Sequence, residues 1–138
     1  MESKKAKIQF LRFLVKESHI VFRNITDYKI EIDFDASGFI DQKESKYYLN
    51  LVANVKDEDD NFEISIVTES VFNFDVDADV NELIESMFTL NAPAIVFPYI
   101  RAYISSLTAL SGMPTLTIPT LNLSKVGETL KENITILE

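Results

Sequence analysis

The sequence predicts an α+β fold, in which an antiparallel sheet of four strands is followed by a helical half. Four segments in residues 8–74 are rich in apolar or alternating β-type residues and are joined by short links, which favours antiparallel neighbours. The following segment, residues 86–124, has one charged residue, Arg101, although 25% of the chain is charged. A segment so poor in charge is expected to be covered, and it forms the second half of the fold.

Length and composition restrict the class of protein. We expect one domain over residues 1–138, which is long enough to bury a core. The chain has no cysteine, so disulfides, thiolate zinc sites and cysteine nucleophiles are excluded. A net charge of -9 disfavours nucleic acid as a partner. Arg12 and Lys16 interrupt the first apolar run, so we expect no signal peptide and a cytoplasmic protein.

The first predicted strand, residues 8–15, is apolar on both faces. Such a strand is either central in a sheet or paired across an interface. Residues 19–24 are expected to continue it after a bulge at Glu17 and Ser18.

The next strands alternate. In residues 28–35, Ile32 and Phe34 point to the apolar side, whereas Glu31, Asp33 and Asp35 form an acidic face. Residues 36–46 are predicted to be a turn, and residues 47–56 and 62–74 the third and fourth strands. The acidic run 57–61 between them lacks the glycine and the distal glutamate of a calcium loop, so a solvated hairpin tip is expected.

Helix signals begin after the fourth strand. Asp79 and Glu82 resemble a capping pair, which predicts a short helix over residues 80–89. Pro93 and Pro98 then predict a main helix that is regular only after about residue 97, with a kink or an irregular start. Gly112 is expected to end this helix.

The main helix is apolar on nearly all sides, except for a thin stripe of Arg101 and several serines and threonines. A helix of this kind is buried on every side, so we expect a second subunit to cover what the sheet leaves open. Residues 92–110 are almost long enough to span a membrane, but two prolines, Arg101 and the serines argue against insertion.

Residues 113–123, here called the strap, alternate apolar residues with threonine, proline and asparagine, and they predict an extended, proline-stiffened segment. Ser124 is expected to cap a final amphipathic helix carrying Val126, Leu130 and Ile134, with a frayed tail over residues 135–138.

Residues suited to catalysis are few. His19 is the single histidine, and neither a nucleophile motif nor metal-ligand spacing accompanies it. Glu31, Asp33 and Asp35 are explained by a solvated strand face, and the three glycines do not form a phosphate loop. We therefore expect no enzyme and no cofactor. Binding through the apolar strap and helix is the favoured class, since a proline-containing apolar strap does not complete a sheet interior.

The motif Asn-Ala-Pro-x-Ile-x-Phe-Pro-Tyr-x-Arg at residues 91–101, followed by Gly112, Pro114-x-Leu116 and Pro119 with Leu121-Asn122-Leu123, resembles the SecB family of export chaperones. The resemblance is strong over about residues 62–130. It implies a four-stranded antiparallel Greek-key sheet with a long kinked helix and a short C-terminal helix packed on one face. It also implies a homotetramer, built as a dimer of dimers with paired first strands.

The resemblance further implies an ATP-independent chaperone that holds unfolded preproteins in apolar grooves and passes them to the motor ATPase SecA. The implied groove residues are Phe72, Phe74, Met113, Leu116, Ile118, Leu121 and Leu123. The implied oligomer interface contains Phe10, Phe13, Ile64, Ile66, Thr68, Ile100 and Ile104.

SecA docking would use acids on the outer sheet face, for which Glu17, Glu63 and Glu69 are the candidates. Arg23 and Ser65 stand where the family pattern has acids. Two alternatives therefore stay open: a SecB-like chaperone dedicated to another client, such as an antitoxin, and a non-chaperone oligomeric adaptor whose acidic face recruits a basic folded partner.

Overall fold

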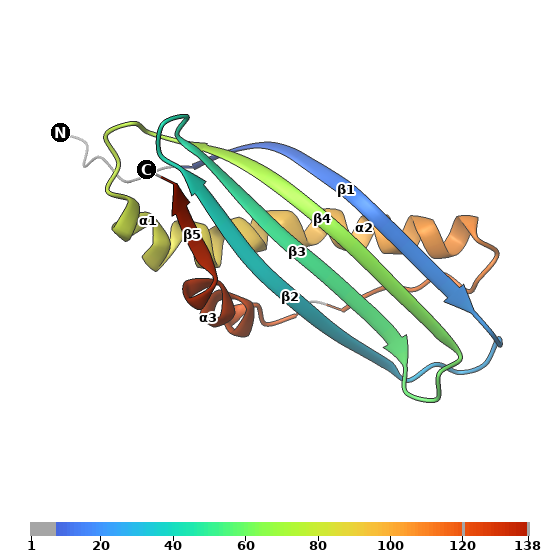
Figure 1. The fold of residues 1–138 in the computed structure, drawn as a ribbon. Helices are drawn as coiled ribbons and strands as arrows, with labels where there is room; N and C mark the ends of the chain where they lie inside the picture. The colour runs from blue at the N-terminus through green and yellow to red at the C-terminus, as the bar shows by residue number, and fades with distance from the viewer. Residues whose placement is uncertain (1–7, 120, 138) are drawn as a thin grey trace.

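The computed structural model describes residues 8–119 and 121–137, which form a five-stranded sheet with helices on one face (Figure 1). Along the chain the elements are β1 (Ile8–Phe22), β2 (Ile30–Asp41), β3 (Lys46–Asp57), β4 (Phe62–Phe74), α1 (Val80–Glu85), the π-helical turn η1 (Met87–Asn91), α2 (Ala92–Leu110), α3 (Ser124–Glu132) and β5 (Ile134–Leu137).

The sheet order is β1-β4-β3-β2-β5. The first four strands pair antiparallel, as expected, but β5 adds a fifth strand that is parallel to β2. The expected four-stranded antiparallel Greek key is therefore not exact. The prediction that placed Ile134 in the final helix and left the tail frayed is wrong, because α3 ends at Glu132 and the β-branched residues after Asn133 pair with β2.

β1 is one long edge strand rather than two segments. Its pairing with β4 shifts between Phe10 and Arg12 and again between Val15 and Glu17. The second irregularity lies one or two residues before the predicted bulge. These bulges change which residues face the helices, so apolar residues reach both sides of the strand.

β2 is longer than predicted, since residues 36–41 belong to the strand and not to a turn. The polar residues and Gly38 suggested a turn. In the structure Gly38 lies within the strand and leaves room for the side chain of Tyr47. A Cβ atom there would lie 2.8 Å from the ring of Tyr47 on β3. The turn is confined to residues 42–45, where Ser45 adopts a φ of 52°.

The helices start and end at recognisable residues. The side chain of Asp79 caps α1 by accepting a hydrogen bond from the Asn81 N–H at 3.0 Å. The short helix ends at Glu85 and not at residue 89. α2 begins at Ala92, earlier than predicted, because Pro93 occupies the first turn and Pro98 is accommodated inside the helix. Gly112, with a φ of 81°, follows its end as predicted.

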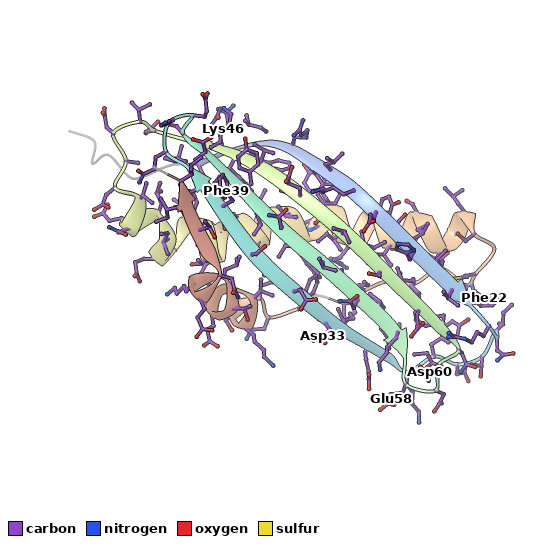
Figure 2. All side chains as sticks on the ribbon, in the orientation of Figure 1. Phe22, Asp33, Phe39, Lys46, Glu58 and Asp60 are labelled. Carbon is purple, nitrogen blue, oxygen red and sulfur yellow. The ribbon has the colours of Figure 1, made fainter. Side chains whose placement is uncertain are left out.

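The core lies between the sheet and α2, with the strap and α3 beside the helix (Figure 1). α3 lies close to η1 at Gly127. A Cβ atom at this position would lie 2.8 Å from the carbonyl oxygen of Thr89. The opposite face of the sheet, called here the outer face, carries polar and acidic side chains; Asp33 is marked in Figure 2. Over the described residues, none of the helices has the length and apolarity that crossing a membrane requires.

Candidate functional site

The strap is held against α2 by the polar stripe of the helix. Arg101 Nε donates to the carbonyl oxygen of Ile118 at 2.8 Å, and Ser105 Oγ donates to that of Leu116 at 2.9 Å. Thr108 Oγ1 accepts the Leu116 N–H at 3.0 Å. These three helix residues are four and three positions apart, so they share one face. The stripe therefore replaces the sheet partners that an extended segment would otherwise need.

This attachment turns the middle of the strap inward. The side chains of Leu116 and Ile118 are 4% and 1% exposed. Five of the seven predicted groove residues lie in the core of the protomer: Phe72, Phe74, Met113, Leu116 and Ile118. In this conformation they are covered by the chain itself.

The last two predicted groove residues, Leu121 and Leu123, are half-buried and line a hollow of about 250 Å³. Ile32 and Phe34 of β2 form its other wall, and Val126 of α3 contributes as well. Polar residues also border the hollow: Asp33, Asn122, Lys125 and Thr129. We call this hollow the β2 groove. It is the place where the described chain offers apolar side chains to a ligand between β2, the strap and α3.

Ile32 and Phe34 were expected as inward-facing sheet residues and not as groove residues. Phe34 also packs edge-on against Phe97 of α2, with ring centroids 5.9 Å apart. Their partial exposure follows from the position of β2 near the sheet edge, which the alternation of residues 28–35 does not reveal.

A second apolar surface is the outward side of α2. Ile95, Tyr99 and Leu110 are 37%, 46% and 89% exposed, and Ala102 lies exposed between them. The Tyr99 ring packs on Phe10 and Phe13 of β1, at centroid distances of 5.2 and 5.5 Å. We call Ile95, Tyr99, Ala102 and Leu110 the α2 outer stripe.

The predicted oligomer-interface residues fall into two groups. Phe10 and Phe13 are half-buried and adjoin the α2 outer stripe. The others are buried inside the protomer: Ile64, Ile66, Thr68, Ile100 and Ile104.

The predicted docking acids share the outer face but do not form a cluster. Glu63 is paired with Arg23 at 3.3 Å, while Glu17 lies opposite Val67 and Glu69 opposite Leu14. Arg23 thus neutralises Glu63, one of the three predicted docking acids.

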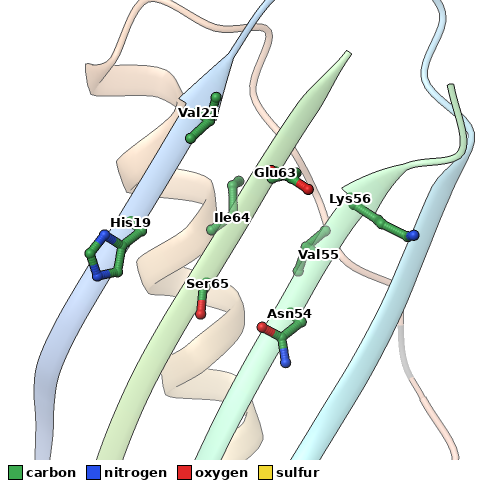
Figure 3. Close-up of a pocket in the computed structure, with 8 residues that line it drawn as sticks. All are labelled: His19, Val21, Asn54, Val55, Lys56, Glu63, Ile64 and Ser65. Carbon is green, nitrogen blue, oxygen red and sulfur yellow. The ribbon is translucent and has the colours of Figure 1, made fainter. Parts of the chain in front are cut away.

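His19 borders a shallow hollow of about 280 Å³ on the outer face, together with Ser65, Asn54, Lys56 and Glu63 (Figure 3). His19 and Asn54 are the cross-strand neighbours of Ser65 on either side. Within the described residues, the side chains of His19 and Ser65 make no hydrogen bond, so no base–nucleophile pair is formed. The same part of the chain also contains no group of three His, Asp or Glu residues placed to hold a metal ion.

Perturbed titratable groups lie elsewhere and are structural. Burial raises the pKa of Tyr47, whose hydroxyl donates to the Phe88 carbonyl oxygen at 3.1 Å. Burial also acts to raise the pKa of Asp57, but hydrogen bonds from Lys29, Asn61 and Asp59 outweigh it and lower the pKa. Neither group borders the β2 groove.

The family model for the preprotein translocase subunit SecB matches residues 8–130, a range that runs from β1 into α3. The chain belongs to the SecB family. This confirms the assignment made from the residue 91–101 motif and the strap. An uncharacterized protein of Methanocaldococcus jannaschii is a similar relative, 22% identical over 135 residues that cover 93% of this chain and 87% of the relative.

Two solved structures resemble this SecB-family fold. The SecB-like chaperone Rv1957 of Mycobacterium tuberculosis, solved with a ChAD peptide from the HigA1 antitoxin, has a TM-score of 0.72 and 15% identity, with 83% of this chain and 88% of that chain covered. A protein of unknown function from Streptococcus agalactiae has a TM-score of 0.51 and 16% identity, with 85% and 100% covered. At these identities the likeness concerns the fold.

Proposed function

We propose that this SecB-family protein is an ATP-independent holdase that binds nonnative polypeptides in the β2 groove. The observation that carries the proposal is the half-exposed apolar lining of this groove, Leu121 and Leu123 facing Ile32 and Phe34. Burial of client side chains there would contribute about 25 cal/mol per Å² of apolar surface removed from water. The role needs neither catalysis nor a cofactor.

We further propose a homotetramer built as a dimer of dimers. Two surfaces support it: the free edge of β1, which in the described chain pairs with β4 alone, and the α2 outer stripe. Several copies of the β2 groove on one particle would bind separate stretches of a long client, and the linkage raises the overall affinity.

Suppression of aggregation tests the groove. An unfolded, reduced client should stay soluble with the protein and without nucleotide, and Leu121→Asp combined with Leu123→Asp should abolish most of this protection. Leu116 and Ile118 are unsuitable positions, since an aspartate buried in the core would unfold the chain.

The matched control is Thr117→Asp, at an exposed strap position. It should protect as well as the unchanged protein. Full protection by the Leu121/Leu123 variant, with its fold intact by circular dichroism, would contradict the groove assignment.

The client is either a preprotein destined for export, with SecA as the next partner, or one dedicated protein such as an antitoxin. The M. tuberculosis chaperone of similar fold binds an antitoxin peptide, which favours the second candidate. Replacement of family-pattern acids by Arg23 and Ser65 also weakens the case for SecA docking. Titration of purified SecA against the protein separates the two, because a dedicated chaperone should show no saturable binding.

A further inference from the structure

The outer face of the sheet is largely polar, but one end of it is apolar. Val71, Tyr48 and Phe39 are successive cross-strand neighbours on β4, β3 and β2, and their side chains point outward. On β1, Leu14 lies diagonally across from Val71, and Leu11 lies in the bulge that faces it. These five residues form an apolar strip across four strands, which we call the outer band.

The outer band has a covered centre and an exposed rim. Val71 is 5% exposed because the side chains of its neighbours surround it, whereas Leu11 and Leu14 are 42% and 41% exposed. The half-buried rings of Phe39 and Tyr48 pack together, with centroids 6.0 Å apart. The described helices all lie on the other face of the sheet (Figure 1). A contiguous apolar surface of this kind is typical of a contact site for another protein.

Two basic side chains border the outer band, although the chain as a whole is acidic. Arg12 lies opposite Val71 and forms no ion pair with any residue in the described ranges. Lys46 lies at the same end of the sheet as Phe39 (Figure 2), and its Nζ donates to the neutral side-chain amide of Asn73. Both cations are therefore available to an acidic partner. The acids elsewhere on this face would instead attract a basic one.

The pairing of the strands restricts the kind of partner. β4 and β3 are paired on both edges, so the face of the sheet offers side chains but no free backbone groups. A partner must then satisfy its own backbone hydrogen bonds, as an α-helix does. Neighbouring strands are about 4.8 Å apart and one helical turn rises about 5.4 Å, so a helix across the strands places about one turn on each. About twelve residues would reach from β1 to β2.

We propose that the outer band docks an amphipathic α-helix of a partner protein, with an apolar face on the band and an acidic flank against Arg12 and Lys46. The other flank of the helix meets Glu69 and Asn50, the next outward pair, so acids are not expected there. The β2 groove is on the opposite side of the sheet, so a client and this partner can bind together. The docking surface goes beyond the holdase proposal and does not depend on it.

Binding of a designed peptide tests the apolar contact. The probe is a fluorescein-labelled, end-blocked helical peptide of about fifteen residues, with leucine once per turn and glutamate along one flank, measured by fluorescence anisotropy. It should bind saturably to the unchanged protein. Leu11→Thr with Phe39→Thr should weaken binding at least about tenfold, since threonine favours a strand but removes most of the apolar contact.

The matched control for the peptide is the groove variant, Leu121→Asp with Leu123→Asp, which should bind it with unchanged affinity. Loss of binding in the groove variant, or binding within about twofold of the unchanged protein by the Leu11/Phe39 variant, would place the peptide outside the outer band and overturn the inference. Circular dichroism checks that both variants are folded.

Charge reversal tests the acidic flank. Arg12→Glu should weaken the glutamate peptide several-fold and strengthen binding of a second peptide that has lysine in place of glutamate. Lys16→Glu, at an exposed position of β1 beyond the band, makes the same change in net charge and should affect either peptide by less than about twofold. Equal effects of the two variants would reflect net charge alone and would overturn the inference.

The two proposals fail separately. Protection of an unfolded client by the Leu11/Phe39 variant should equal that of the unchanged protein. If clients are protected but the unchanged protein binds no peptide, the docking surface is wrong and the holdase proposal stands. If the peptide tests succeed and no client is protected, the holdase proposal is wrong and the docking surface stands.

Discussion

Asp57 closes the hairpin between β3 and β4. Its buried carboxylate accepts hydrogen bonds from the N–H groups of Lys29 at 2.8 Å and Asn61 at 3.2 Å, and from the side-chain amide of Asn61. The acidic run 57–61 was expected to be a solvated tip, and the turn at Asp60, with a φ of 59°, agrees. The first acid of the run is nevertheless internal, because it ties the start of β2 to the hairpin.

The stability lost on replacement of Asp57 should depend on pH in a defined window. Hydrogen bonds lower its pKa in the folded protein, so its contribution is present above the unfolded value of about 4 and is lost as the pH falls through the lower folded pKa. The Asp57→Asn variant should therefore be less stable than the unchanged protein at pH 7. The difference between their urea midpoints should shrink below about pH 4. A gap that stays constant from pH 7 to pH 2.5 would contradict this account.

Among the elements, the alternating strands were the most predictable. The fourth strand occupies residues 62–74 as predicted, and the third differs by one residue at each end. Residues 36–41 and 134–137 were missed because their status as strand depends on distant partners: the Tyr47 ring that requires Gly38, and the β2 edge that pairs with β5. The local β-propensity of these residues does not predict either of these long-range contacts.

The polar stripe on α2 was visible in the sequence, whereas its role in holding the strap was not. Ser105→Ala removes the bond to the Leu116 carbonyl oxygen and should cost about 0.5–1.5 kcal/mol of stability. It should also speed amide exchange in the strap. Ser106→Ala, one residue further and exposed, is the matched control and should change neither property. Equal effects of the two variants in urea unfolding would show that the bond at residue 105 does not hold the strap.

At the scale of the whole molecule, residue type did not reveal which apolar groups are exposed. Leu116, Ile118 and Leu121 are all apolar residues of the strap, yet the first two are buried and the third lines the β2 groove. Among the described residues, the side-chain hydrogen bonds from α2 to the strap are made at Leu116 and Ile118, which holds these two side chains against the core. The family and its α+β class were predictable from the residue 91–101 motif, but the open part of the groove was not.

The size of the particle in solution tests how the α2 outer stripe is covered. A helix that exposes Ile95, Tyr99 and Leu110 on one side should self-associate, and sedimentation equilibrium should give four times the 15.7 kDa of one chain. Ala102→Arg places a charge in the middle of the stripe without touching the protomer core, so it should reduce the particle to a dimer or monomer. Glu82→Arg, at an exposed position of α1, is the control and should leave the mass unchanged. A monomer at micromolar concentration for the unchanged protein would remove the multivalent binding on which the holdase proposal relies, since a single β2 groove of about 250 Å³ admits only a few side chains at a time.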